Sequence, residues 1–433
     1  MKIYLIGIGG IGVSALARYF KSEGHDVSGS DIAGSALIDD LKGEGIECKI
    51  GLASAENVPG DVDRVIYSPA IETNHPEMEQ AKLLGAKIQS YPEALGEVSR
   101  NHFTLAVTGS HGKSTTTSLL ALMMIEAGLD PTVVVGTKLV EFGGSNFRKG
   151  KSKYLVIEAD DFNRSFYQYQ PQIAVVTNVD EEHLDTYGDM DGVIEGFHHF
   201  LGELPSESNV ILNKGDQHTS KISEGVQAKL HYFDTTKAPK WPLQIPGEFN
   251  QQNAEAAWRA AELVGVTRSQ AEAAVSKYKG AWRRLEPLEA KDPSLKDMIV
   301  FSDYGHHPTE IRATLSALKE RYPSEKITLV FQPHQARRLT QLFDKFASAF
   351  DDADKVILLP VYKVEGRDEE GGRTSGELKD ALIETGKGEV GLVGTIVETL
   401  DRLDKGVVVF MGAGDIDGQV RQYFKSKLIH TPT

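Results

Sequence analysis

The sequence predicts an α/β protein with several mainly parallel sheets, and three observations carry this prediction. Short apolar runs of strand-like composition alternate with stretches of helical periodicity along almost the whole chain, which is typical of βαβ units. The length of 433 residues exceeds what one hydrophobic core usually serves, so two or three domains are expected. The strand–helix pattern restarts near residues 102 and 298. We therefore expect three domains, at residues 1–99, 100–287 and 288–433.

The expected elements follow from the apolar periodicity. In the first domain, a strand at residues 2–7 precedes a helix at 11–23. In the second, the strands are expected at 102–109, 154–160, 173–179 and 209–213, with one helix ending near Gly128 and another at 251–265. In the third, strands at 298–305, 326–333, 355–362 and 406–415 accompany a helix that begins at Pro308. The Gly-rich, charged stretch at 366–376 is predicted to be an exposed loop.

A glycine turn follows the first strand. Gly7, Gly9 and Gly12 have the spacing that permits a tight turn and close approach of a pyrophosphate, and Asp31 ends the next strand. The helix N-terminus after the turn then faces the anion. The first domain is therefore predicted to be Rossmann-like, with a dinucleotide or nucleotide-diphosphate site. The pattern does not identify the nucleotide, and a turn that binds nothing is the alternative.

A second phosphate-binding turn opens the central domain. Gly109 and Gly112 frame a G-x-x-G-K-S turn between a strand and a helix, which is two residues shorter than the usual phosphate loop. Backbone N–H groups of such a turn surround phosphate oxygens, Lys113 reaches the terminal phosphates, and the Ser114 hydroxyl is suited to Mg²⁺. A central ATPase-type α/β domain is expected. Two phosphate-binding turns in separate domains suggest that two phosphorylated ligands meet.

Polar side chains follow two strands of the central domain. Glu158, Asp160 and Asp161 end one strand, and His183 follows the next. Ligands and metals collect at the carboxyl edge of an open α/β sheet, and oxygen ligands suit Mg²⁺. In the third domain, the strand-end segments SDYGHHPTEI (302–311) and FQPHQARR (331–338) predict a ligand-facing rim.

The composition of the chain limits the classes of molecule and the compartment expected for this protein. The formal net charge of −15 argues against nucleic acid or an anionic membrane surface as the main partner. A single cysteine, Cys48, rules out an intramolecular disulfide and suits a reducing cytoplasm. No uninterrupted apolar run is long enough to span a bilayer. The sequence leaves the oligomeric state open.

Taken together, the motifs resemble the Mur ligase family of peptidoglycan synthesis. The segments TGSHGKSTTT, EADD, TNVDEEHLDTY, PGEFNQQNAEAA, RRLE, DYGHHPTE, FQPH and GAGDI occur in that family's order across nearly the whole chain. The resemblance implies a domain for a UDP-sugar, a central ATPase domain and a C-terminal domain for an amino acid. It also implies ATP- and Mg²⁺-dependent joining of L-alanine to the lactyl carboxylate of UDP-N-acetylmuramate through an acyl phosphate.

The resemblance further implies roles for individual residues. Lys113, Glu158 and His183 would be catalytic, and Ser114, Glu158 and His183 would hold metal. ATP would be bound by Gly109, Ser110, His111, Gly112, Lys113, Ser114, Thr115, Asn250, Asn253, Arg283, Arg284, Asp303 and Tyr304. The UDP-sugar and the amino acid would contact Gly7, Gly9, Gly10, Ile11, Gly12, Asp31, Ser68, His306, His334 and Arg338.

Departures from the family pattern keep alternatives open. Phe249 stands where the family usually has histidine, and Gln335 stands where an arginine usually precedes Arg338 by three residues. A ligase that recycles a whole murein tripeptide shares most motifs and is the first alternative. A nicotinamide-dependent dehydrogenase that uses the glycine turn and Asp31 is less favoured, because the loop at 109–114 would lack a purpose. A binding protein with a decayed ATPase site is disfavoured, since Lys113 and its partners are present.

Overall fold

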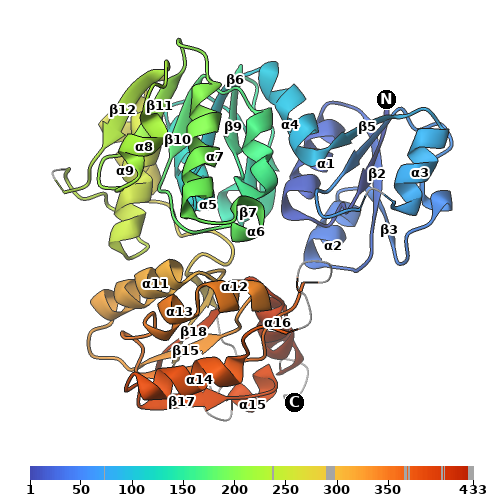
Figure 1. Cartoon of the computed structure of the whole chain (residues 1–433). Helices are drawn as coiled ribbons and strands as arrows, with labels where there is room; N and C mark the ends of the chain where they lie inside the picture. The colour runs from blue at the N-terminus through green and yellow to red at the C-terminus, as the bar shows by residue number, and fades with distance from the viewer. Residues whose placement is uncertain are drawn as a thin grey trace, which may run out of the picture. The chain divides into compact units, whose positions relative to one another are not determined.

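The computed structural model describes residues 1–427 except 73, 237, 289–297, 365–367, 369–370, 401–402 and 404. Residues 366–367 and 369–370 of the expected loop at 366–376 therefore lie outside the described residues. The chain forms three sheets, which Figure 1 shows with their helices. Residues 1–242 and 251–278 form one compact unit with the first two sheets, and residues 243–250 and 279 onward form a second unit with the third. The predicted α/β class is confirmed.

The first sheet is parallel throughout, in the order β3-β2-β1-β4-β5. Its strands are β1 (Lys2–Ile6), β2 (Asp26–Asp31), β3 (Glu47–Ile50), β4 (Arg64–Tyr67) and β5 (Lys87–Ser90). Its helices are α1 (Ile11–Ser22), α2 (Ala36–Gly43), η1 (Ala55–Asn57), α3 (Pro76–Leu83) and α4 (Tyr91–Arg100). The strand order reverses between β1 and β4, so the glycine turn after β1 lies at the position where open α/β sheets bind ligands.

The second sheet has the order β12-β11-β10-β6-β9-β7-β8, and β8 is an antiparallel edge strand. Its strands are β6 (Phe103–Thr108), β7 (Thr132–Leu139), β8 (Ser145–Arg148), β9 (Tyr154–Glu158), β10 (Ile173–Val176), β11 (Asn209–Asn213) and β12 (Lys229–Phe233). Its helices are α5 (Lys113–Glu126), η2 (Val140–Phe142), η3 (Phe162–Gln168), α6 (Leu184–Tyr187), α7 (Met190–Gly202), α8 (Thr219–Ser223), α9 (Glu248–Glu262) and α10 (Arg268–Val275). Three neighbouring strands, β10, β6 and β9, thus end at one edge.

The first two sheets share one hydrophobic core, to which α1, α4 and α7 contribute buried side chains. A buried polar contact also joins them, because Arg18 of α1 donates from Nη1 to Oδ1 of Asn146 in β8 at 2.5 Å. Asn146 in turn donates to the Ser14 hydroxyl at 2.9 Å. The two sheets therefore hold their ligand-facing edges in a defined relationship.

The third sheet has the order β13-β14-β18-β15-β16-β17, in which only β13 pairs antiparallel. Its strands are β13 (Glu286–Leu288), β14 (Met298–Asp303), β15 (Ile327–Phe331), β16 (Lys355–Leu358), β17 (Glu389–Leu392) and β18 (Gly406–Met411). Its helices are α11 (Pro308–Arg321), α12 (Ala336–Gln341), α13 (Phe343–Ala347), α14 (Ser375–Glu384), α15 (Ile396–Leu400) and α16 (Ile416–Lys427). In the described part of the chain, no helix is long and apolar enough to cross a membrane.

Candidate active site

The loop between β6 and α5 depends on two glycines. Gly109 has φ 128° and Gly112 has φ 81°, conformations that residues with a side chain rarely adopt. A Cβ atom on Gly109 would lie only 2.1 Å from Oγ1 of Thr177, which follows β10. Thr177 Oγ1 and Asn178 Nδ2 both donate to the carbonyl of His111, at 2.6 and 3.0 Å. The end of β10 therefore holds the loop in a fixed conformation.

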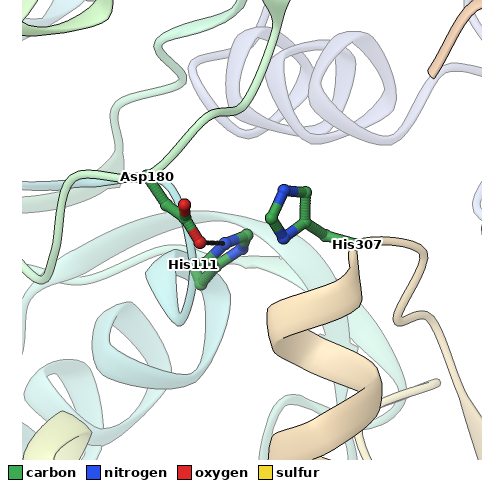
Figure 2. Close-up of side chains that lie close together, drawn as sticks. All are labelled: His111, Asp180 and His307. Atoms are coloured by element: carbon green, nitrogen blue, oxygen red, sulfur yellow. Dashed lines mark hydrogen bonds and ion pairs between the residues drawn. The ribbon is translucent and has the colours of Figure 1, made fainter. Parts of the chain in front are cut away.

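A second contact with the β10 end orders the other side of the loop. His111 Nε2 lies 3.1 Å from Oδ2 of Asp180. Figure 2 marks this contact with a dashed line. The backbone N–H of Asp180 donates to the Ser110 hydroxyl at 2.8 Å. Thr115 is buried in the first turn of α5. The predicted loop residues 109–115 thus form one ordered turn at the N-terminus of a helix, which suits a phosphate anion.

Lys113 occupies the centre of this turn. Its ammonium donates to the carbonyls of Gly109 and Ser110, at 2.8 and 3.2 Å, and to Oδ1 of Asp161 at 2.7 Å. Asp160 Oδ1 lies 3.7 Å away. Burial alone would lower the pKa of Lys113, but Asp161 and Asp160 outweigh burial and raise it. The lysine therefore carries a full positive charge beside the turn.

Glu158 and Ser114 form a second polar group beside the lysine. The Ser114 hydroxyl donates to Oε1 of Glu158 at 3.0 Å, and the N–H of Gly136 donates to Oε2 at 2.7 Å. Ser114 is almost fully buried. The predicted metal pair is thus brought together by the parallel pairing of β6 with β9.

His183 lies close to the carboxylates of Asp160 and Asp161. Its Nε2 lies 4.0 Å from Oδ1 of Asp160 and 3.9 Å from Oδ1 of Asp161. The three side chains place one ligand atom each within 4.8 Å of one another. Within the described residues, Asp161 Oδ2 and His183 Nδ1 are buried without a hydrogen-bond partner. Such orphaned acceptors, with two carboxylates and an imidazole, fit a divalent cation.

Burial and neighbouring charges shift the pKa of Asp160, the more exposed of the two aspartates. Burial alone would raise the pKa of Asp160, but the charges of Lys113 and His183 outweigh burial and lower it. Asp161 is fully buried, whereas half of the Asp160 side chain is exposed. Asp160 therefore stays ionised near neutral pH, on the open side of the site.

The glycine turn of the first sheet has its own anchors. The N–H of Gly9 donates to Oδ2 of Asp31 at 2.9 Å, so this carboxylate braces the turn. Gly7 has φ 76°, and a Cβ atom there would lie 3.0 Å from Cβ of Ser68. Gly10 precedes α1 as its N-cap, so Ile11 and Gly12 form the first helical turn. The residues of the glycine turn, Asp31 and Ser68, all predicted to bind substrate, therefore gather around one turn, as expected of a diphosphate site.

The predicted nucleoside contacts are divided between the two units. Asn253 belongs to the first unit, where its Oδ1 accepts from Thr116 at 3.2 Å and where a Cβ on Gly112 would lie 2.3 Å from the same atom. Asn250 belongs to the second unit and donates to the carbonyl of Pro246 at 2.6 Å. Asn253 thus contacts the phosphate loop itself, although both asparagines lie on α9.

The second unit carries the remaining predicted ATP contacts around the end of β14. Asp303 accepts from the N–H groups of Leu285 and Gly305, each at 2.7 Å, and burial raises its pKa to about 6. Arg283, at φ 58°, donates to the carbonyls of Gly412 and Gly414. The guanidinium groups of Arg283 and Arg284 lie 4.8 and 4.9 Å from the ring centre of Tyr304. Arg283, Arg284, Asp303 and Tyr304 therefore form one cluster.

The predicted amino-acid contacts form a neighbouring aromatic cluster in the same unit. The rings of His306 and His334 lie 5.9 Å apart, and His334 stacks on Tyr362 at 5.7 Å with an interplanar angle of 9°. Arg338 Nη1 lies 3.3 Å from Nδ1 of His334. The buried Gln335, at φ 68°, donates its N–H to the carbonyl of Tyr362 at 2.9 Å. The structure thus brings His306, His334 and Arg338 together at the rim predicted from the sequence.

Comparisons with known proteins agree with this geometry. Three family models match in order: a Mur ligase catalytic domain over residues 2–103, a Mur ligase middle domain over 107–241 and a Mur ligase glutamate ligase domain over 283–414. The chain is 36% identical to the UDP-N-acetylmuramate–L-alanine ligase of Caldanaerobacter subterraneus subsp. tengcongensis, covering 96% of this chain and 95% of the relative.

Solved structures show the same similarity in three dimensions. The structure of the UDP-N-acetylmuramate–alanine ligase from Thermotoga maritima matches with a TM-score of 0.81 and 27% identity over 100% of both chains. A murein peptide ligase from Psychrobacter arcticus matches over 100% of both chains with a TM-score of 0.73 and 21% identity. At that identity the second match shows a shared fold alone.

Proposed function

The chain belongs to the Mur ligase family, and we propose that it joins L-alanine to the lactyl carboxylate of UDP-N-acetylmuramate, converting ATP to ADP and phosphate. The observation that carries this proposal is the partly buried Lys113, held in the phosphate loop of the unit that also carries the diphosphate-type glycine turn. A phosphoryl donor and a nucleotide-sugar acceptor would thus each bind to one compact unit. The lone Cys48 suits a reducing cytoplasm as the compartment.

The reaction would proceed in two displacements. A lactyl carboxylate oxygen attacks the γ-phosphorus of ATP, which forms an acyl phosphate and releases ADP. The neutral amine of L-alanine then attacks the acyl carbon, and phosphate leaves from the tetrahedral intermediate as the amine loses its proton. Catalysis of phosphoryl transfer rests mainly on alignment and on stabilisation of charge on the transferred group.

Lys113 supplies the positive charge that this chemistry needs. Its Nζ, held by two loop carbonyls, lies where the β- and γ-phosphates of a loop-bound nucleotide would be. The backbone N–H groups of the turn would bind the remaining phosphate oxygens. When ATP binds, the phosphates would compete with Asp161 for the lysine ammonium.

Mg²⁺ is proposed as the cofactor, and two oxygen-rich groups suit it. Ser114 with Glu158 would hold one ion, and His183 with Asp160 and Asp161 would hold another. The bound cation would neutralise charge on the phosphate oxygens. The orphaned Asp161 Oδ2 supports this assignment, because its neighbouring oxygen is already occupied by Lys113.

The acceptor is assigned to the cluster around His334 in the second unit. Arg338 would provide the cation that a free amino-acid carboxylate requires; the ring of His334 lies beside it, and that of His306 lies against His334. Gln335 replaces the arginine that the family pattern places there, and this favours an acceptor with different carboxylate contacts. A murein tripeptide is therefore retained as the second candidate acceptor.

Release of phosphate from ATP tests the proposal. The chain would be incubated with ATP, Mg²⁺ and UDP-N-acetylmuramate, together with L-alanine, L-serine, glycine or the murein tripeptide. The main proposal expects phosphate release with L-alanine and a product heavier by one alanyl residue. Release of phosphate only with the tripeptide would establish the recycling reaction instead. If none of the four acceptors gave phosphate release, both candidate reactions would be refuted.

A further inference from the structure

Two tyrosines of the first unit, Tyr91 and Tyr169, lie near its ligand-facing groups. Tyr91 begins α4, where Ser90 caps the helix and Pro92 occupies its first turn. Its ring packs directly against Gly12, since a Cβ atom there would lie 2.7 Å from the ring carbon that bears the hydroxyl and 2.9 Å from the hydroxyl oxygen. The phenol of Tyr91 therefore lies on the first turn of the helix that follows the glycine turn.

The same phenol is also close to the acidic groups of the second sheet. Burial raises the pKa of Tyr91, and the charges of Glu158 and Asp160 raise it further. Tyr169, which is 2% exposed, has its pKa raised by burial and by the neighbouring Tyr91 and Asp160. Both phenols therefore lie close enough to Asp160 to be influenced by its charge, and that of Tyr91 also lies against Gly12.

Close packing fixes these rings in place. Helix α4 approaches η3 so tightly that a Cβ atom on Gly96 would lie 2.5 Å from the carbonyl oxygen of Gln168, the residue before Tyr169. Tyr169 belongs to the shared hydrophobic core, and Tyr91 packs against it. The two phenols are therefore pre-positioned by the backbone.

In the part of the chain that the structure describes, their hydroxyls make no hydrogen bond, whereas two other tyrosines of the same unit are paired. Tyr187 donates to the carbonyl of Asp161 at 2.7 Å, and Tyr4 donates to Glu77 at 3.3 Å. A phenol that makes no hydrogen bond within the protein can donate its O–H to a bound ligand.

We propose that Tyr91 and Tyr169 bind the reacting end of the sugar nucleotide by donating hydrogen bonds to its lactyl carboxylate. This inference rests on the proposed function and assigns two residues to it. A carboxylate that approaches Glu158 and Asp160 meets like charge. Neutral O–H donors can bind an anion there and remain protonated, whereas a further cation would be drawn to the acidic pair. The same donors would hold the acyl phosphate for the incoming amine.

Calorimetry without ATP tests this inference. It would compare the binding of UDP-N-acetylmuramate with that of UDP, in the parent and in the variants Tyr91→Phe and Tyr169→Phe. UDP lacks the lactyl carboxylate. A hydrogen bond to a charged group is worth about 1.5–3 kcal/mol, so each variant should bind UDP-N-acetylmuramate at least about tenfold more weakly. UDP affinity should not change. Tyr154→Phe, at the opposite end of β9, is the matched control.

The outcomes separate this inference from the proposed function. Variants that bind UDP-N-acetylmuramate as the parent does, while the parent makes product, would overturn the inference alone. Equal loss of affinity for UDP and for UDP-N-acetylmuramate would also overturn it, because the effect would not concern the carboxylate. A parent chain that binds no UDP-N-acetylmuramate would overturn both. Thermal stability is the structural check: removal of an unpaired hydroxyl should leave Tm unchanged or raised.

Discussion

The Nζ atom of Lys113 lies 2.7 Å from Oδ1 of Asp161, a fully buried carboxylate at the end of the neighbouring strand β9. The pair holds the lysine in the loop with its charge intact. Since the second oxygen of Asp161 is buried without a partner among the described residues, the same carboxylate can serve a cation without releasing Lys113. One residue thus links the phosphate loop to the proposed metal group.

Replacement of Asp161 tests the strength of this link. Asp161→Ala should lower the free energy of unfolding by about 3 kcal/mol, because it removes the hydrogen-bonded carboxylate of a partly buried lysine and leaves only the more distant Asp160. Asp160→Ala is the matched control, since its side chain is half exposed and 3.7 Å from the same ammonium. Urea unfolding of the two variants provides the measurement, and equal losses would show that the Asp161 pair has no special role.

The fit of the phosphate loop against β10 predicts a steric effect at Gly109. Gly109→Ala combines an unfavourable φ with a Cβ atom 2.1 Å from Thr177 Oγ1, so it should displace the loop and reduce kcat about a hundredfold or more. Gly128→Ala has a similar positive φ of 78° but open space around it. Steady-state assays should therefore find kcat of the second variant near that of the parent. A comparable loss in both would refute the steric explanation.

Asp303 predicts a pH dependence of stability. Burial raises its pKa from 3.8 to about 6, although the N–H groups of Gly305 and Leu285 and the charge of Arg284 act in the opposite direction. The folded state therefore binds this proton more tightly than the unfolded state. The resulting stabilisation is fully present below the unfolded pKa of 3.8 and is lost as the pH rises through about 6.

Comparison of the parent with Asp303→Asn isolates this contribution. Above about pH 7 the difference in unfolding free energy between the two should be constant, and between about pH 4 and 6 the parent should gain stability relative to the variant as the pH falls. Urea titrations across this range measure the difference. A difference that is independent of pH would show that Asp303 keeps an ordinary pKa.

Arg338 is predicted to act on the acceptor alone. Arg338→Ala should raise the KM for the acceptor by about tenfold or more while the KM for ATP stays within about twofold, because a charge-assisted hydrogen bond to the acceptor carboxylate is lost. Arg337→Ala removes an adjacent, exposed arginine and should have little effect. An unchanged acceptor KM for Arg338→Ala would place the amino-acid site elsewhere.

The parts of the site that could be predicted from the sequence are those encoded within a few consecutive residues. Gly109, Gly112 and Lys113 form one local turn, so their spacing alone indicates a phosphate site. Glu158 was predicted because it ends a strand, and the parallel pairing of β6 with β9 does place it beside Ser114. Strand positions were also predictable: residues 209–213 coincide with β11, although β16 and β18 each end four residues before the predicted limits of 362 and 415.

Contacts between distant segments could not be predicted in this way. The contacts of His183 with Asp160 and Asp161 are of this kind, because they depend on how the loop after β10 folds against the loop after β9. No sequence motif marks Tyr91 and Tyr169, because their positions depend on the close packing of α4 against η3. The sequence does not mark Tyr362 either, because its stacking on His334 arises only where the segments of these two residues pair. The domain boundaries and the individual residue roles stay predictions.

The most direct test of the central claim follows the carboxylate oxygens of UDP-N-acetylmuramate during turnover. The substrate would be labelled with ¹⁸O at both lactyl carboxylate oxygens and incubated with ATP, Mg²⁺ and L-alanine. If the carboxylate attacks the γ-phosphorus and the amine then displaces phosphate, the released phosphate should carry one ¹⁸O atom and the amide product should keep the other. Release of unlabelled phosphate, with both labels retained in the sugar nucleotide, would contradict the account.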